Sequence, residues 1–315
     1  MYAKENYRKV KEIIESRRLK ALGDAEAKNL EVAAMSEDIR TIDSELRGVG
    51  LLLFKTACEG GDIAPIRERN LFLGEERRRV LKKLGLPEDY TEVKYTCSEC
   101  SDSGFVGTRM CRCLREMLIT ENIKSSGMGA LIEKQSFENF DVSRYKNNEE
   151  AYEKMKNNLE KTKKYAEDFN KSPTMMLLVG NTGTGKTHLS TAIAKTVIEK
   201  GYEVLYDSAQ NIISAFENDR FRSGYGQYDP EGTKYLECDL LILDDLGTEF
   251  LNQFTVSCLY NLINTRQNKG LHTIISTNLL PSQITARYED RVYSRIMGRN
   301  SLILHFLGKD SRLEV

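Results

Sequence analysis

A glycine-rich octapeptide, GNTGTGKT, spans Gly180–Thr187 and matches the pattern G-x-x-x-x-G-K-[ST] without departure. Its glycines let the backbone curl until several N–H groups point at phosphate oxygens. In such a loop Lys186 reaches the β- and γ-phosphates of a nucleotide, and the Thr187 hydroxyl binds Mg²⁺. An apolar run precedes the loop and a helical segment follows it, as the motif requires. The sequence predicts binding of ATP and Mg²⁺ by Gly180, Asn181, Thr182, Gly183, Thr184, Gly185, Lys186, Thr187 and His188, with a structural role for His188.

Two consecutive aspartates end a second apolar run, DLLILDD, at residues 239–245. The apolar residues Leu240–Leu243 indicate a buried strand, and open α/β sheets bind ligands beyond the carboxyl ends of their strands. We therefore expect Asp244 to hold Mg²⁺ through water, and Asp245 to orient and activate the water that attacks ATP. The other interpretation of Asp245 is a solvated carboxylate at the end of a strand.

Polar side chains further along the chain can complete this site. The segment STN, Ser276–Asn278, ends the next apolar run, and Asn278 is a better candidate than Thr277 for contact with the γ-phosphate or the attacking water. The segment RVYSRI carries Arg291 and Arg295, which share one helix face because they are four residues apart. They are either salt-bridge residues or, in an assembled ring or spiral, a source of positive charge for a neighbouring subunit's nucleotide.

Four of the seven cysteines lie within 17 residues, at Cys97, Cys100, Cys111 and Cys113. The C-x-x-C and C-x-C pairs can form a closed tetrahedral thiolate site, which is the geometry of structural zinc. An iron–sulfur cluster and unligated thiols are the alternatives. Three arginines close by in sequence can offset the negative charge of such a site: Arg109, Arg112 and Arg115. The remaining cysteines are expected to be small buried hydrophobic residues: Cys58, Cys238 and Cys258.

Short apolar runs alternate with helical segments from residue 174 onward, which predicts an α/β domain with a mainly parallel sheet. Strands are expected at 174–179, 203–206, 239–244 and 272–277. Helices are expected between them at 186–199, 208–217 and 253–267. Before this domain, residues 149–169 predict a polar helix, and SFENF at 136–140 predicts an extended docking segment.

The first 96 residues are strongly charged and predict a small helical bundle. Apolar residues spaced by three or four positions mark one face of an amphipathic helix: Met35, Ile39, Ile42, Leu46, Val49 and Leu53. A shorter helix is expected before it, around Tyr7–Ile14, and another behind it, around Val80–Leu84.

The composition excludes several classes of protein. The chain has 315 residues, 30% of them charged, and a net charge of −1, so it is not a globally basic nucleic-acid binder. No apolar run approaches the roughly 20 residues that span a bilayer. The N-terminus has no apolar core of a signal peptide, so a cytoplasmic location without membrane contact is expected.

These motifs, in the order GNTGTGKTHL, LLILDDLGTE, IISTN and RVYSRI, resemble the AAA+ ATPases of the DnaC/DnaI type, the replicative helicase loaders of bacteria and phages. The cysteine cluster followed by SFENF resembles the segment before the ATPase module in Gram-positive loaders. The resemblance covers roughly residues 95–310. It implies a parallel P-loop module without a C-terminal lid, preceded by a helical zinc-binding domain.

The resemblance also implies roles for particular residues. Gly180–Thr187 would be Walker A, Asp244 and Asp245 Walker B, and Asn278 sensor 1. Arg295, with Arg291 as the alternative, would be an arginine finger acting in a neighbouring subunit. Such a loader grips a hexameric DNA helicase through its N-terminal domain and assembles into a ring or spiral on single-stranded DNA. Basic and aromatic residues at 216–230 suit a single strand, although the segment could equally be a surface loop: Arg220, Phe221, Arg222, Tyr225 and Tyr228.

Three parts of the chain are thus expected to have different tasks. They are a helical, zinc-binding docking domain (1–115), a linker with a polar helix (116–170) and an AAA+ ATPase domain (171–315). Two other functions fit the same motifs. One is a transposition-helper ATPase of the IstB type, which binds DNA and a transposase, and the other is an interaction protein that binds ATP with little turnover.

Overall fold

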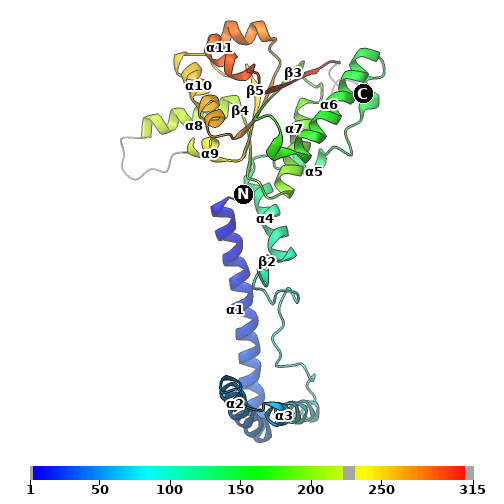
Figure 1. Ribbon diagram of the computed structural model, residues 1–315, viewed down its shortest axis with the longest axis vertical. Helices are drawn as coiled ribbons and strands as arrows, with labels where there is room; N and C mark the ends of the chain where they lie inside the picture. Colours follow the sequence, from blue (N-terminus) through cyan, green and yellow to red (C-terminus); the bar gives the residue numbers. More distant parts are fainter. Residues whose placement is uncertain (1–2, 223–230, 309–315) are drawn as a thin grey trace. The chain divides into compact units, whose positions relative to one another are not determined.

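The computed structural model describes residues 3–222 and 231–308, which form two compact units. One unit spans residues 9–115, and the other combines residues 3–8 with the described residues from 116 onward. Helices dominate the first unit, and a parallel sheet forms the centre of the second (Figure 1).

The first unit contains α1 (Lys4–Met35) from residue 9 onward, α2 (Glu37–Cys58) and α3 (Ala64–Lys83). Ser36 separates α1 from α2 because its extended backbone ends one helix and its side chain accepts the N–H of Ile39, capping the next. The expectation of one helix from Met35 to Leu53 is therefore wrong at its start. Met35 ends α1 with its side chain 56% exposed, whereas the stripe from Ile39 to Leu53 is the less exposed face of α2.

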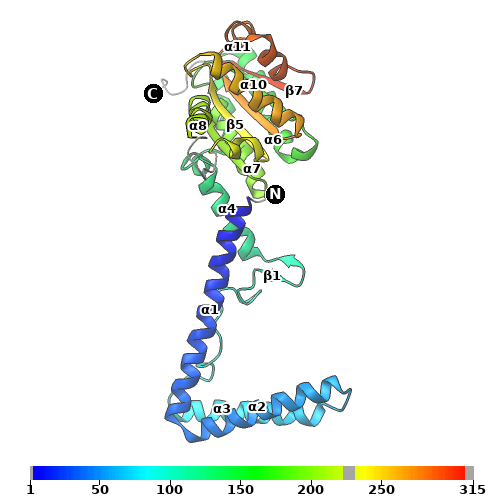
Figure 2. The same cartoon turned by 90° about the vertical axis from the view of Figure 1, so that its left-hand side faces the viewer.

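A single arginine connects the three helices of this unit. Arg77 of α3 donates to Asp43 on α2 at 2.6 Å, to Asn29 on α1 at 2.7 Å and to Thr91 at 2.6 Å. Its side chain is only 14% exposed, so these charge-assisted hydrogen bonds are shielded from water. A buried apolar cluster draws on the same three helices: Val32, Ile39 and Leu81. Figure 2 shows α2 and α3 side by side along their lengths.

The cysteine-rich segment follows α3. Two short antiparallel strands, β1 (Phe105–Val106) and β2 (Arg109–Met110), form a hairpin, and α4 (Arg112–Ser125) begins directly after it. Gly104 has a φ of +79°, and a Cβ there would lie 3.1 Å from Leu114 on α4. The hairpin can therefore lie close to α4 only with glycine at this position.

The second unit is built on a five-stranded parallel sheet, which confirms the expected sheet and adds a fifth strand, at Ser301–Phe306, to the four expected strands. Its strands are β3 (Met175–Gly180), β4 (Val204–Ser208), β5 (Leu240–Leu246), β6 (His272–Thr277) and β7 (Ser301–Phe306). They lie in the order β4-β5-β6-β3-β7. The strand β6 thus lies between β3, which leads into the glycine-rich loop, and β5, which ends in the aspartate pair.

Helices cover both faces of this sheet (Figure 1). One face carries α8 (Ala209–Arg222), α9 (Thr233–Glu237), α10 (Gln253–Asn268) and α11 (Pro281–Ile296). The other carries α5 (Leu131–Lys134), α6 (Glu149–Glu167) and α7 (Lys186–Glu199). Along β3, Leu177 packs into the first core and Leu178 into the second, because successive strand residues point to opposite faces.

Short 3₁₀ turns lie on either side of α6, at Val142–Tyr145 and Phe169–Lys171. Phe137 and Phe140 of the SFENF segment are both buried in the core beside α7. No helix among the described residues has both the length and the apolar character needed to cross a membrane.

Candidate functional site

The glycine-rich loop turns between the end of β3 and the start of α7. Gly183 and Gly185 have φ values of +73° and +89°, which residues other than glycine rarely adopt. At Gly180 a Cβ would lie 2.3 Å from the carbonyl oxygen of Phe306, so any side chain would push β7 away. The loop shape therefore depends on glycine, and its N–H groups lie at the amino end of α7, a site that favours anions.

Lys186 and Thr187 begin α7. The Lys186 ammonium is buried and donates to the carbonyls of Gly180 at 2.7 Å and Asn181 at 2.8 Å, so it lies within the loop. The Thr187 hydroxyl is 3.4 Å from Oδ2 of Asp244. The loop and the carboxyl end of β5 therefore converge.

Asp244 is buried and accepts hydrogen bonds from both neighbouring strands. Tyr206, from β4, donates its phenol to Oδ2, and Ser276, from β6, donates its hydroxyl to Oδ1. Burial, and next the negative charge of Asp244, raises the pKa of Tyr206, so the phenol keeps its proton. Sequence reasoning did not identify Tyr206. The available signal was a polar residue at the end of the strand beside Asp244.

Asp245 differs from Asp244 in both backbone and exposure. Its φ is +54°, the pairing of β5 with β6 is interrupted between Leu243 and Leu246, and its side chain is exposed. Its N–H donates to the Ser276 hydroxyl at 3.0 Å, so Ser276 contacts both aspartates. This irregular strand end sets the Asp245 carboxylate on the exposed side of the site.

The polar residues Thr277 and Asn278, at the end of β6, have different environments. Thr277 is fully buried and donates to the carbonyl of Leu246 at 2.6 Å, which holds β5 and β6 together. Asn278 is exposed at the end of the strand. The geometry therefore leaves Asn278, rather than Thr277, able to contact a ligand.

His188 contacts the segment that precedes the ATPase module. Its Nε2 lies 2.9 Å from the Ser136 carbonyl and 2.9 Å from Oδ1 of Asn139, and its ring meets the edge of Phe140. Burial lowers the pKa of His188, so the ring is neutral at pH 7. Tyr145 donates to the carbonyl of Thr184 at 3.0 Å. The SFENF segment and its neighbours thus support the back of the glycine-rich loop.

The two candidate arginines lie in the last part of α11. Glu289, with a φ of +68°, breaks this helix before them. Arg291 pairs with Glu289 at 3.1 Å and lies over the Tyr260 ring at 5.5 Å. Arg295 is partly exposed, and its carbonyl accepts a hydrogen bond from Gln267. Within the part of the chain that the structure describes, the Arg295 guanidinium makes no ion pair.

A buried carboxylate that sequence reasoning missed lies just after β5. Glu249 accepts the N–H of Gly247 at 2.9 Å and the Tyr288 phenol, and Arg287 bonds both its side chain and its carbonyl. These contacts fix the loop after Asp245 against α11. LGTE followed the aspartate pair in the sequence, but nothing there indicated that Glu249 would be buried.

The four clustered cysteines converge at one point. Their sulfur atoms all lie within 4.8 Å of one another, with Cys97 and Cys111 at 3.8 Å and Cys100 and Cys113 at 3.5 Å. Tetrahedral bonds of about 2.3 Å from zinc to sulfur place the sulfurs about 3.8 Å apart. The donor set and its spacing therefore fit zinc. The buried Asp102 holds the turn by accepting the N–H of Cys97 at 2.9 Å.

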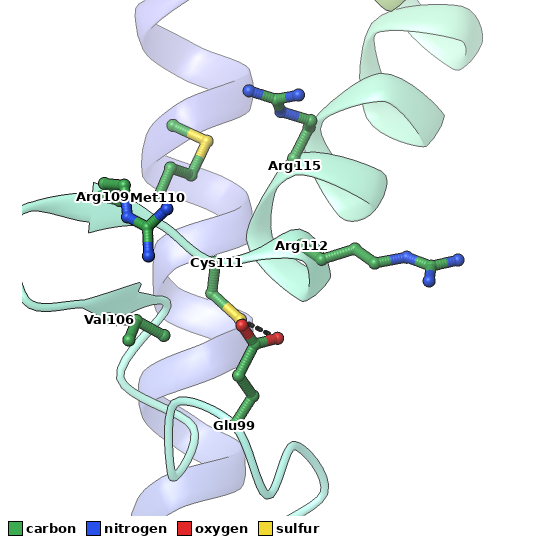
Figure 3. Close-up of a pocket in the computed structure, with 7 residues that line it drawn as sticks. All are labelled: Glu99, Val106, Arg109, Met110, Cys111, Arg112 and Arg115. Carbon is green, nitrogen blue, oxygen red and sulfur yellow. Dashed lines mark hydrogen bonds between the residues drawn. The ribbon is translucent and has the colours of Figure 1, made fainter.

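Three arginines lie close to Cys111, the cysteine of this cluster that Figure 3 draws. Arg109 comes from β2 and Arg112 and Arg115 from α4, and with Glu99 and Cys111 they line a cavity of about 440 Å³. Four thiolates with zinc carry a charge of −2, and Glu99 adds another negative charge. The positive charges of these arginines are close enough to offset that negative charge.

The other three cysteines do not share one environment. Cys238 and Cys258 are buried, and burial raises the pKa of Cys238 to about 11 and that of Cys258 to about 12. Cys58 is exposed near the end of α2, so its expected burial is wrong. The exposure of Cys58 could not be predicted from the sequence, because it depends on which residues pack against the end of α2, and the turn that follows is itself exposed.

The segment proposed to contact DNA is only partly described. The Arg220 guanidinium lies 5.5 Å from the centre of the Phe254 ring, and Phe221 is 72% exposed. Tyr225 and Tyr228, together with the side chain of Arg222, lie outside the described residues.

The glycine-rich loop on β3 and the aspartate pair on β5 have one strand, β6, between them. With a parallel sheet and helices on both faces, this arrangement holds a nucleotide and its metal in P-loop ATPases of the AAA+ type, and this protein is one of them.

A model of IstB-like ATP-binding proteins matches residues 115–304, and the chain belongs to that family. The replicative helicase loader DnaC of Escherichia coli K12 is 27% identical over 192 residues, which are 61% of this chain and 75% of the relative. DnaC of Buchnera aphidicola subsp. Acyrthosiphon pisum is 25% identical over 183 residues, 58% of this chain and 70% of the relative. The chain in the crystal structure of DnaI is 19% identical in sequence, and the two structures align with a TM-score of 0.44 over 58% of this chain and 94% of that one.

Proposed function

We propose that this protein loads a replicative DNA helicase onto single-stranded DNA and hydrolyses ATP as it does so. The observation that carries this proposal is the similarity to helicase loaders named DnaC over 75% of the relative's length. The sequence of motifs from Gly180 to Arg295 supports it.

The ATPase chemistry is assigned to residues that converge on the loop. Lys186 binds the β- and γ-phosphates, and Asn278 contacts the γ-phosphate or the attacking water. Thr187 and Asp244 hold Mg²⁺, which when bound neutralises developing charge on the phosphates. Asp245 orients the water and accepts its proton, and Arg295 completes the site of a neighbouring subunit in a ring or spiral.

The three parts of the chain divide this work. Residues 1–115 dock the helicase. Residues 116–170 connect this domain to the ATPase domain and pack against the core of the latter. Residues 171–315 bind and hydrolyse ATP and contact single-stranded DNA. Arg220 and Phe221 of α8 supply the DNA contact from the described residues, through phosphate neutralisation and base stacking.

The helicase docks on exposed apolar side chains of the α2–α3 hairpin. Leu51 and Phe54, 73% and 71% exposed, lie three residues apart on one side of α2. Leu71 and Phe72 on α3 are 59% and 49% exposed. Large apolar side chains held in water on a rigid helix pair are typical anchors of a protein interface.

Replacing both Leu51 and Phe54 by Ser is expected to weaken helicase binding about 30-fold, since an interface hot spot contributes about 2 kcal/mol. ATP hydrolysis by the free protein should not change. The measurement is binding to the purified hexameric helicase, followed by a helicase-loading assay on single-stranded DNA.

The matched control replaces Leu19 and Leu30 of α1, which are 69% and 68% exposed in the same unit, by Ser. The hairpin assignment is wrong if both double variants bind the helicase equally well. The loader proposal itself fails if the unchanged protein neither binds nor loads the helicase.

The family name favours a second candidate, a transposition helper of the IstB type. Such a protein binds duplex DNA and a transposase. Tight binding to duplex DNA with ATP, together with no helicase binding, would support this candidate in place of the loader.

Zinc in the cysteine cluster has a structural role because all four ligands come from the protein. Replacing Cys100 by Ser is expected to lower zinc from one equivalent per chain and to lower the melting temperature of the N-terminal unit, since zinc binding is coupled to folding. ATP affinity should stay within about twofold, because the module around Lys186 keeps its own core.

Elemental analysis and thermal melting measure these effects, with Cys58→Ser, an exposed thiol outside the cluster, as the control. Iron with a visible absorption band, or the absence of any metal from the unchanged protein, would contradict the zinc assignment.

A further inference from the structure

Tyr206 connects the carboxylate of Asp244 to a distant part of the chain. Its phenol donates to Oδ2 of Asp244, the same oxygen that lies 3.4 Å from the Thr187 hydroxyl. Ser276 occupies Oδ1 from the other side. A carboxylate has about four lone-pair positions, so these donors restrict its rotation and still leave Oδ1 with room for a further contact.

The main chain of Tyr206 is itself held by the segment that follows α4. Its N–H donates to the carbonyl of Ser126 at 2.8 Å, along the outer edge of β4. At Gly127, where φ is +82°, a Cβ would lie 2.5 Å from the Tyr206 carbonyl oxygen. Ser126 is fully buried, and Met128, buried as well, packs into the core beside α7. The backbone that carries the phenol is therefore fixed from outside the sheet.

We propose that Tyr206 is a positioning residue of the ATPase: its phenol, anchored through Ser126 and Gly127, orients the Asp244 carboxylate for Mg²⁺. The proposal rests on the proposed role of Asp244 in holding Mg²⁺. Residues that orient a metal's ligands typically change metal affinity about 10–100-fold when they are removed. The Tyr206 phenol is hydrogen-bonded to Asp244, so we expect its effect on Mg²⁺ binding to pass through that carboxylate.

The test is Tyr206→Phe, which removes the hydroxyl and keeps the ring. Affinity for a fluorescent ATP analogue is measured with Mg²⁺ and with EDTA, and the ratio of the two affinities is compared. We expect the ratio to fall about tenfold, through weaker binding with Mg²⁺ and unchanged binding in EDTA. Because the ratio is taken within one variant, a loss of folded protein lowers both affinities and leaves it unchanged.

Two further variants serve as a control and as a test of the backbone anchor. Tyr235→Phe removes a phenol that donates to Asp207, the neighbour of Tyr206, and should leave the ratio at its wild-type value. Gly127→Ala should lower the ratio without altering the phenol, because it displaces the Tyr206 backbone.

Asp244→Asn separates failure of the inference from failure of the proposed function. If Asp244→Asn lowers the ratio and Tyr206→Phe does not, the positioning role is wrong. If Asp244→Asn leaves the ratio unchanged, Asp244 does not hold Mg²⁺, and both assignments fall. Equal losses with Mg²⁺ and EDTA in Tyr206→Phe would show that the residue is merely structural.

Discussion

Replacing Asp245 by Asn is expected to slow ATP hydrolysis about 100-fold or more while ATP still binds, because a positioned general base contributes about 10²–10⁴ in rate. The carboxylate is exposed at the irregular end of β5, beside the buried Asp244. The amide of Asn can still accept a hydrogen bond from water but cannot take its proton. Phosphate release in a single turnover, started with saturating ATP and Mg²⁺, measures the chemical step.

Two controls define what this result means. Asp239→Asn makes the same change at the opposite end of the strand, where the side chain accepts the N–H of Glu203, and should hydrolyse ATP normally. Lys186→Ala should lose ATP binding itself, since the ammonium is the loop's charged contact to phosphate. Hydrolysis at the wild-type rate in Asp245→Asn would return Asp245 to the role of a solvated strand-end carboxylate.

The phosphate loop could be predicted from sequence because most of its requirements are local. Gly183 and Gly185 have the positive φ values that the turn itself needs, whereas the close approach of Phe306 to Gly180 is a long-range contact that only the structure shows. The flanking strand and helix follow from a short apolar run and a helical segment. The parallel sheet was predictable for the same reason, since its strands are buried on both faces and appear as short apolar runs.

The supports of Asp244 could not be predicted in this way. Tyr206 and Ser276 reach Asp244 only because β4 and β6 lie on either side of β5, and strand order is a property of the whole sheet. Glu249 likewise contacts Tyr288 and Arg287, which lie 39 and 38 residues further along the chain. Residue type and spacing do not indicate such long-range contacts.

In the N-terminal region, too, the sequence pattern predicted only part of the structure. The apolar spacing from Ile39 to Leu53 correctly marked the inner face of α2. Extending it to Met35 fitted the period but ignored Ser36, whose side chain can cap a helix. Periodicity identifies a face, whereas the end of a helix is decided by one capping side chain.

Arg295→Ala is expected to bind ATP almost normally as a monomer and to lose about 100-fold or more in hydrolysis once assembled. An arginine finger contributes about 10³–10⁵ in small GTPases. The structure distinguishes it from Arg291, whose guanidinium pairs with Glu289 and lies over the Tyr260 ring. Since Arg291 already has partners in its own subunit, Arg291→Ala is the matched control and should retain most of the activity of the assembly.

Mixing two inactive variants tests whether Arg295 acts on a neighbouring subunit. Arg295→Ala keeps an intact phosphate loop, and Lys186→Ala keeps an intact arginine. Interfaces that pair the loop of the first with the arginine of the second contain every group, so the mixture should regain part of the activity that neither variant has alone. Co-assembly is checked by light scattering at the same concentrations. If the variants co-assemble and hydrolysis does not recover, Arg295 does not act across the interface, and its effect must arise within its own subunit.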